Sequence, residues 1–471
     1  MTTKQNSESN TEPAAVRNSH SDPKRKNSVR VALTLLLPVA MVLARPLGMT
    51  AGQSFVLGSL FTVIAWWGTG WVKRNIASAM LLLVFLLFGH TPVVQIFNFP
   101  LSGNIVMIVA AYLLSEGIVQ SGAVDSLSDY LLSTYCKTYA HMVIASFVLC
   151  TVLIFAIPQP FPRVVLLAAI YINFLRERPE NEERKKVLLF SIFVAATVTS
   201  LMFVNGDVIV NCAAVEFGDL ELSFASWTRY MTVPTMIASA LTALLFIAVF
   251  RRELQGPIEG PGAKAAFSVG PEGKRALAVT AVVVLLWLTE PVHGIGAASV
   301  AAIGVAGMFA VRVLKLKDFK VVSPGLMLFL TAQFAIGRVL VASGIAGHIR
   351  IALTHMLPAP EHALFLPALV LALMALHMVM GSVITALSFS IPMLIAMTEG
   401  LYAPELIALL VLVSVAWHFL LPFHHVTLVI GFGSGFYENR HVLRFGAVLT
   451  LLVFASVFLL YIPWWKLTGL M

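Results

Sequence analysis

The sequence predicts an all-α polytopic membrane protein with two inverted repeats, each holding a re-entrant hairpin and an interrupted transmembrane helix. Three observations lead to this prediction. Hydrophobic residues fill 59% of the 471 positions and charged residues only 11%, a composition unlike that of soluble proteins. Apolar runs near the length that crosses a bilayer recur along the chain and amount to about 11 spans plus two hairpins. Two interruptions of apolar runs in the first half return at matching places in the second.

The start of the chain predicts its orientation. Residues 1–29 are rich in Ser, Asn, Lys and Pro, which is typical of a disordered tail. Lys24-Arg25-Lys26 and Arg30 then precede the apolar run 31–44, and such basic clusters mark the cytoplasmic side of a membrane helix. We therefore expect a cytoplasmic N-terminal tail on a multi-pass protein of the cell (inner) membrane.

Charge and cysteine usage exclude other classes. The net charge of +8 comes from basic residues at loop ends, as membrane topology requires, so we expect no nucleic-acid partner. Cys136, Cys150 and Cys212 are scattered and lack paired spacing, so neither a disulfide framework nor a zinc site is predicted. We expect no cofactor beyond a coupling Na⁺ or H⁺.

Apolar periodicity divides the chain into two halves. The first half, 30–252, precedes a Gly/Pro-rich cytoplasmic linker, 253–274, and the second half is 275–471. Single helices are expected near 31–48, 53–72, 76–92, 104–122, 228–250, 275–290, 295–312 and 325–344.

The first hairpin, about 140–175, is centred on three prolines. Pro158, Pro160 and Pro162 remove backbone donors and fix φ, so we expect no helix to pass through 158–162. The flanking arms, 140–157 and 163–175, are short for a span, which favours a hairpin with both ends on one side. Such a break is tolerated only within protein or beside a water-filled cavity.

The helix that follows, 187–216, is too long for a simple span and is interrupted at Asn205-Gly-Asp207. Both the hairpin and the interrupted helix recur in the second half. At an offset of 222, Ser121-Gly122 falls on Ser343-Gly344, and Pro158–Arg163 falls on 380–385, the tip of a second hairpin at about 362–400. At an offset of 216, the helix break falls on Phe419–Phe423, within a second broken helix, 404–435, interrupted at Pro422.

Charge gives the relative orientation of the repeats. With both hairpins re-entrant, most of the 31 Lys and Arg residues lie in the tail and in loops on one side, which is then the cytoplasm. The helix at 104–122 then runs inward and its repeat at 325–344 runs outward. The halves are therefore inverted, as in secondary transporters whose discontinuous helices meet at a midplane site.

Half-helices that end inside a membrane present oriented backbone dipoles to ions. At the first tip, Gln159 and Arg163 could face an anion, or Arg163 could reach the membrane surface while the tip only packs. At the second tip, Gly381, Ser382 and Thr385 offer close backbone approach and hydroxyl groups, or serve helix packing alone.

The breaks of the two long helices add further candidates. The first break contains Asn205, Gly206, Asp207 and Asn211. The Asp207 carboxylate at membrane depth would suit a cation or proton, or it could lie near the outer end of its helix. The second break contains Pro422, His424, His425 and Thr427. Its two histidines suit proton coupling, a pH-dependent anion contact or a structural role.

Four other polar positions are expected to be structural. Glu116 and Arg338 occupy equivalent repeat positions and are expected to pair across the repeat. His377 and His418 are expected to face the core or an interface, without forming a metal site.

Over nearly its whole length after residue 30, the chain resembles the divalent anion:sodium symporter (DASS) family of the ion transporter superfamily. The similar stretches are Ser121-Gly122, Trp287-Leu-Thr-Glu290-Pro-Val-His293, Asn205-Gly-Asp-Val-Ile-Val-Asn211, Ser226-Trp227, Leu421-Pro422, Gly433-Ser-Gly435, Leu443-Arg-Phe-Gly446 and Trp464-Trp465. The Ser-Asn-Thr motifs that the family carries at its hairpin tips are replaced here by Gln159-Pro-Phe-Pro and by Ser382 and Thr385 without asparagine.

The resemblance implies a homodimer in which both hairpins belong to a transport domain that moves as an elevator against a scaffold. Together with the residues, it predicts a secondary transporter of a small anion, a di- or tricarboxylate or sulfate. The substrate site would use Gln159, Arg163, Asn205, Asn211, Ser382, Thr385, His424, His425 and Thr427. The coupling ion would use Gly206, Asp207, Gly381, Ser382 and Pro422.

Three alternatives compete with this reading. The first is an exporter or uniporter of the wider superfamily. An integral-membrane enzyme using Asp207, His424 and His425 would need a nucleophile motif or metal spacing, and neither accompanies them, so no enzyme activity is expected. A membrane sensor would need an output domain supplied by a partner.

Overall fold

The computed structural model describes residues 31–69, 71–176, 181–221, 223–258 and 268–471. The protein is 79% helical, and the described residues contain no strand, which confirms the all-α prediction. The predicted disordered tail, 1–29, lies outside the described residues, and the predicted linker, 253–274, is described only at its two ends.

Four helical stretches in the described residues are long and apolar enough to cross a membrane, judged by length and composition. They are Gly103–Gln120, Phe224–Val249, Pro324–Ala342 and Asn439–Thr468. Eight shorter apolar helices of 10–17 residues accompany them, among them the first arm of the first predicted hairpin, both arms of the second and the first part of the second broken helix. The short lengths follow from the backbone breaks described below.

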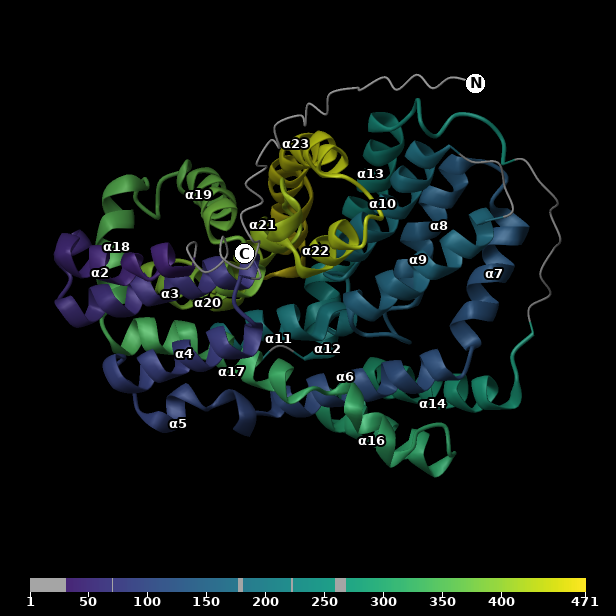
Figure 1. Cartoon of the computed structure of the whole chain (residues 1–471), viewed down its shortest axis with the longest axis horizontal. Helices are drawn as coiled ribbons and strands as arrows, with labels where there is room; N and C mark the ends of the chain where they lie inside the picture. The colour runs from purple at the N-terminus through teal and green to yellow at the C-terminus, as the bar shows by residue number, and fades with distance from the viewer. Residues whose placement is uncertain (1–30, 70, 177–180, 222, 259–267) are drawn as a thin grey trace, which may run out of the picture.

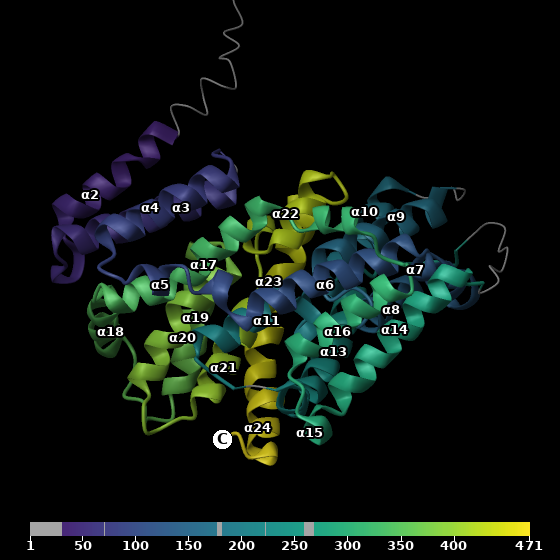
Figure 2. The same cartoon turned by 90° about the horizontal axis from the view of Figure 1, so that it is seen from below.

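The N-terminal helices form one end of the molecule. Here α2 (Leu36–Ala44) packs on α3 (Ala51–Thr69), and α3 packs on α4 (Arg74–Phe88), as Figures 1 and 2 show. The first helix ends earlier than the predicted 31–48 because Arg45 is left-handed, with φ of 42°, and Pro46 follows it. Two short turns, α5 (Val93–Ile96) and Phe99–Leu101, lead into α6.

The same order of elements occurs twice. The first run is α6 (Gly103–Gln120), α7 (Ala123–Tyr135), α8 (Tyr139–Val152), α9 (Pro160–Arg176), α10 (Glu182–Thr199), α11 (Val208–Phe217), α12 (Phe224–Trp227) and α13 (Val233–Val249). The second run is α17 (Pro324–Ala342), α18 (Ile345–Met356), α19 (Phe365–Met380), α20 (Val383–Met397), α21 (Pro404–Ala416), α22 (Val426–Gly433), α23 (Asn439–Ser456) and α24 (Ile462–Thr468). Between them lie α14 (Pro271–Leu288), α15 (Glu290–His293), α16 (Ala297–Ala310) and the turn Leu316–Val321.

Local irregularities recur with the elements. Gly122 and Gly344, with φ of 67° and 79°, occupy the left-handed turn that starts α7 and α18. A π-helical turn interrupts the last long helix of each run, at Thr228–Thr232 and at Val457–Tyr461. Most of the segment 123–139, between α6 and α8, is the helix α7, whose buried Val124, Ser128 and Leu132 share one helical face.

The first hairpin breaks earlier than expected. Residues 153–159 separate α8 from α9, and α9 begins at Pro160. Pro160 and Pro162 therefore lie in the first turn of α9, where the backbone N–H groups have no intrahelical acceptor in any case. No helix runs through the whole of 158–162, but the break lies at 153–159, and residues 160–162 belong to α9.

The two helix breaks share one backbone conformation. Phe203 and Leu421 are extended with nearly the same angles, a 3₁₀ turn follows each, and Asp207 and His425 are the extended N-cap residues of α11 and α22. The structural offset between the breaks is therefore 218, and the offset of 216 taken from the sequence is two residues short. In this register Asp207 corresponds to His425.

The half-helices after the breaks join the two halves of the chain. α11 of the first half packs on α20 and α21 of the second, whereas α22 of the second half packs on α9 and α10 of the first. Figure 1 shows α11 beside α20 and α22 beside α10. Residues far apart in the sequence are therefore brought together around the breaks.

Candidate functional site

A cavity of about 460 Å³ lies where the hairpins and the helix breaks meet. The first turns of four helices form much of its wall: Pro160 and Phe161 of α9, Ile209 and Val210 of α11, Val383 and Ile384 of α20, and Val426 and Thr427 of α22. The N-terminus of a helix carries partial positive charge and unpaired N–H groups. Four such ends on one wall favour an anion in the cavity.

The four ends differ in the N–H groups that they offer, and at the start of α9 Pro160 and Pro162 have none. Asp207 accepts from the N–H of Val210 at 3.2 Å and caps α11. Ser382 accepts from the N–H of Thr385 at 3.4 Å and caps α20 more weakly. No side chain caps α22, whose N-cap is His425, so its first N–H groups remain available to a ligand.

Seven of the residues predicted for the site line this cavity. They are Gln159, Asp207, Gly381, Ser382, His424, His425 and Thr427. They come from both hairpin tips and both helix breaks, so the structure brings together the four interruptions that the sequence singled out. Gly381 is left-handed, with φ of 59°, a conformation that glycine adopts without strain.

Arg163 does not line the cavity. Its side chain is fully buried, and its guanidinium donates to the carbonyl oxygens of Cys150 at 3.2 Å and Gly206 at 2.7 Å. It therefore joins the end of α8 and the start of α9 to the first helix break. These contacts place Arg163 behind the wall that a substrate would touch.

Other predicted residues also lie behind the wall. The amide of Asn211 donates to the carbonyl oxygens of Ser200 and Phe203 at 2.9 and 3.0 Å and so holds the first break closed. A Cβ at Gly206 would lie 2.2 Å from the carbonyl oxygen of Ser200, so only glycine fits there. Asn205 is fully buried, and its amide atoms have no hydrogen-bond partner in the described residues.

The second tip has a similar support. The Thr385 hydroxyl lies 3.2 Å from Oε1 of Gln333 and 3.0 Å from Oγ of Ser382. Thr385 itself is buried and is not part of the cavity wall, and Pro422 lies in the 3₁₀ turn behind it. Thr385 therefore links the Ser382 hydroxyl, which is on the wall, to α17.

Sequence reasoning missed several wall residues, notably Arg74, Tyr112, Gln333 and Phe423. Gln333 left a signal, because it is the one side-chain amide in a mainly apolar 19-residue helix whose only charged residue is Arg338. Arg74 lies at the start of α4 over the ring of Phe329, with 4.9 Å between its Cζ atom and the ring centroid. Basic residues at a helix end predict an interface, so its place in a cavity wall could not be read from the sequence.

The expected pair between Glu116 and Arg338 is not formed. Arg338 of α17 pairs instead with Glu216, near the end of α11, while Glu116 accepts from Gln120 at 2.6 Å. Glu216 also accepts from the amide of Asn98 at 3.1 Å. Equivalent positions in two repeats need not touch, because each packs against different helices.

Four histidines gather at the second break. His377 of α19 has ring-centroid distances of 6.0 Å to His418, 5.3 Å to His424 and 5.7 Å to His425. His377 and His418 are buried, as expected. The described residues contain no cluster of His, Cys, Asp or Glu arranged to hold a metal ion.

Comparison with known proteins identifies the family of the chain. No curated protein matches the chain. The family described as "Sodium:sulfate symporter transmembrane region" matches residues 24–471, almost the whole chain, and corresponds to the resemblance seen in the sequence. The protein is therefore an integral membrane protein of the sodium:sulfate symporter (DASS) family, a family of secondary anion transporters.

Proposed function

We propose that this protein is a secondary active transporter that moves a small anion, a di- or tricarboxylate or sulfate, through the cavity between the two repeats. The observation that carries this proposal is the convergence of four helix N-termini on one cavity wall. A site built from backbone dipoles suits an anion better than a cation. Gln159, Ser382 and Thr427 add polar side chains that orient it.

The cavity wall also suggests the state of the transporter. Arg74 and Ser323 belong to the segments 73–75 and 312–324, which we expect to be cytoplasmic, and both line the cavity. An opening on that side corresponds to an inward-facing state. In this state Arg74 is the basic residue on the wall that an anion meets on its way to the site.

The interlocked half-helices favour an elevator. Because α11 packs on α20 and α21 while α22 packs on α9 and α10, the hairpins and breaks form one packed unit that carries the whole site. This unit would move against α3, α4, α6 and α17, in a homodimer of the inner membrane with a cytoplasmic N-terminus. Many secondary transporters that work by alternating access are built from inverted repeats, as predicted here.

Residue roles follow from position. Gln159, Ser382, His424, His425 and Thr427 contact the anion, and Asp207 offers the carboxylate that a coupling cation would meet. Arg163, Asn211 and Thr385 position these groups through the hydrogen bonds described above. Coupling is to Na⁺ or H⁺.

The test is uptake of labelled sulfate, succinate, citrate and tartrate into proteoliposomes. Each anion is offered with a Na⁺ gradient, a proton gradient or neither, and Ser382→Ala is compared with wild type. We expect saturable, gradient-driven uptake of one anion class, with KM raised about tenfold by loss of one hydrogen bond to a charged group.

Thr354→Ala is the matched control, because the Thr354 hydroxyl donates to Arg350 on exposed α18, away from the cavity. Its uptake should equal that of wild type. No uptake of any of the four anions by folded wild-type protein would contradict the proposal. Efflux from loaded vesicles without uptake would identify an exporter instead.

A further inference from the structure

The hydrogen bonds of the four-histidine cluster assign the proton on each ring. Nε2 of His377 lies 3.3 Å from the carbonyl oxygen of His424, and Nε2 of His425 lies 3.3 Å from the carbonyl oxygen of His418. A carbonyl oxygen only accepts, so both rings carry their proton on Nε2. Their Nδ1 atoms are then lone-pair acceptors.

His418 follows the same rule. Its Nε2 lies 3.0 Å from the hydroxyl oxygen of Thr450, and that hydroxyl donates its own proton to the carbonyl oxygen of Gly446. The Thr450 oxygen must therefore accept from His418. The Nδ1 atoms of His377 and His418 are buried and have no hydrogen-bond partner in the described residues.

His424 differs from the other three in which ring nitrogen has a hydrogen-bond partner. Its Nδ1 accepts from the backbone N–H groups of Leu420 and Leu421, at 3.1 and 3.3 Å. The neutral ring must then carry its proton on Nε2, and this buried N–H has no partner in the described residues. Because His424 lines the cavity, it offers a fixed donor to an anion, and Nδ1 cannot accept a proton without breaking the turn.

The helices around the cluster provide no nearby compensating charge. Apart from His377, α19, α20 and α22 contain no titratable residue, and the carboxylate of α21, Glu405, lies in its first turn, at the end opposite His418. Arg163 of α9 is bound to carbonyl oxygens. The charged residues at the start of α10 and α23 are engaged with each other or with Glu253: Glu183, Lys186, Glu438, Arg440, His441 and Arg444.

Two charged groups share the cavity wall with the cluster. They are Asp207, the N-cap of α11, and Arg74, at the start of α4. Asp207 is engaged with the N–H of Val210. A buried imidazolium beside this cavity is therefore unfavourable when the cavity is empty, and an anion in the cavity supplies the missing negative charge.

We propose that this cluster is the proton-binding site of the transport cycle, where His424 donates from Nε2 to the anion and one proton is bound among the Nδ1 atoms of His377, His418 and His425. The inference rests on the proposed function and identifies its coupling ion as H⁺. Half-buried His425 lines the cavity, so the proton enters from cavity water and leaves to water on the other side. Ring centroids within 6.0 Å limit the cluster to one proton, because two such charges repel.

Linkage makes the coupling reciprocal. If the anion favours protonation of the cluster, protonation favours anion binding by the same factor. One proton per anion across a difference of about one pH unit raises the equilibrium accumulation of the anion about tenfold.

The test is uptake of labelled sulfate and labelled succinate into proteoliposomes, acidic outside, with equal Na⁺ on both sides.

Substitutions can separate the two roles. His377→Gln and His425→Gln keep a donor near Nε2 but remove the basic nitrogen, so we expect both to lose the response to the pH gradient. Downhill uptake should be retained in His377→Gln, whereas His425→Gln should also raise KM because His425 contacts the anion. His424→Asn keeps an acceptor near Nδ1 but removes the donor, so KM for the anion should rise about tenfold while the pH response remains. His355→Gln, on the exposed face of α18, is the control and should match wild type.

The outcomes distinguish failure of the proton site from failure of the transport proposal. Uptake by wild type that follows only Na⁺ and ignores the pH gradient would overturn the proton site and leave anion transport standing, as would an unchanged pH response in His425→Gln. No uptake under any gradient would overturn both. Thermal unfolding of each purified variant checks its folding, and His425→Gln decides the test if His377→Gln does not fold.

Discussion

The guanidinium of Arg163, in the first turn of α9, donates to the carbonyl oxygen of Gly206, in the first helix break, at 2.7 Å. A second bond from the same side chain reaches the carbonyl oxygen of Cys150 at 3.2 Å. Arg163 therefore connects three segments that would otherwise leave backbone acceptors unpaired. The charged guanidinium stabilises the backbone behind the site and is not part of the cavity wall.

Arg163→Ala should destabilise the protein by on the order of 3 kcal/mol, because two hydrogen bonds from a buried charged group are lost. Thermal unfolding of the purified protein measures this, and labelled-sulfate uptake should fall in parallel. Arg176→Ala, at the exposed end of α9, is the control and should change stability by less than about 0.5 kcal/mol. Unchanged stability with a raised KM would instead make Arg163 a direct anion contact.

The Glu216–Arg338 pair links α11 to α17, and a double-mutant cycle can measure it. Glu216→Gln, Arg338→Gln and the double variant should give a coupling energy of about 0.5–3 kcal/mol in thermal or denaturant unfolding. Glu116→Gln in combination with Arg338→Gln should give additive effects, since Glu116 bonds Gln120 instead. Additivity of the Glu216 cycle would show that the pair is not formed.

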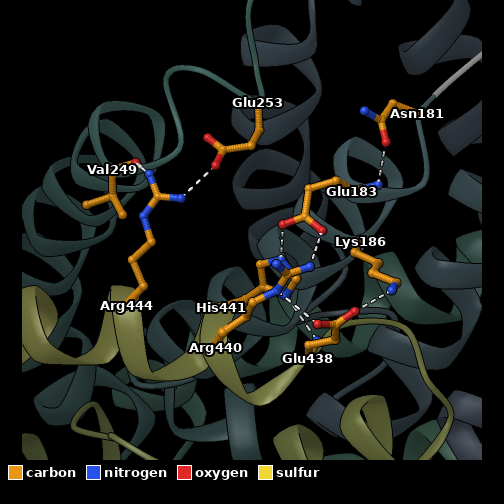
Figure 3. Close-up of polar contacts among 9 residues, drawn as sticks. All are labelled: Asn181, Glu183, Lys186, Val249, Glu253, Glu438, Arg440, His441 and Arg444. Carbon is orange, nitrogen blue, oxygen red and sulfur yellow. Dashed lines mark hydrogen bonds and ion pairs between the residues drawn. The ribbon is translucent and has the colours of Figure 1, made fainter.

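Charged residues at the start of α10 and α23 predict a loss of stability in acid. Figure 3 shows Glu183 between His441 and Arg440, and Lys186 beside Glu438. The Lys186 Nζ atom lies 2.5 Å from Oε1 of Glu438. The hydrogen bond from Lys186 holds the pKa of Glu438 below its ordinary value. A depressed pKa means that the stabilisation is present at neutral pH and is lost as the pH falls below about 5.

The melting temperature should therefore fall more steeply from pH 7 to pH 4 in wild type than in Glu438→Gln. Salt should reduce the difference, since these side chains are partly exposed. Glu361→Gln, on an exposed turn, should leave the pH profile unchanged. Equal profiles for wild type and Glu438→Gln would rule out this contribution.

Cysteine labelling can test the direction in which the cavity opens. The three native cysteines are buried, so a cysteine introduced at Ser323, on the cavity wall, should dominate the reaction with a membrane-impermeant thiol reagent. We expect Ser323→Cys to react from the cytoplasmic side and Leu401→Cys, in the exposed turn after α20, to react only from the other side. Reaction of both from one side would contradict the topology.

The sequence could predict most of the backbone. Helices are interrupted near the prolines of 158–162, at Asn205-Gly-Asp207 and at Pro422. These interruptions can be predicted because proline lacks a backbone N–H and glycine allows unusual backbone angles, whatever their neighbours in space. The repeated Ser-Gly ends before α7 and α18 were readable for the same reason. Boundaries shifted by a few residues where proline fits a first helical turn, as at Pro160.

The site was only partly predictable. All four interruptions meet at one cavity, yet Arg163, Asn211 and Thr385 lie behind its wall while Arg74 and Gln333 are on it. A sequence shows that a polar residue lies within an apolar segment. The direction in which its side chain points depends on which helices pack around that segment.

The sequence by itself therefore determined the helices, their interruptions and the repeated order, since each depends on neighbours a few residues away along the chain. Tertiary structure decided the partners: Glu216 for Arg338, the Gly206 carbonyl for Arg163, and His377 for His424, 47 residues apart. These contacts form because α11 and α22 each pack into the opposite half, and such packing is a property of the assembled surfaces.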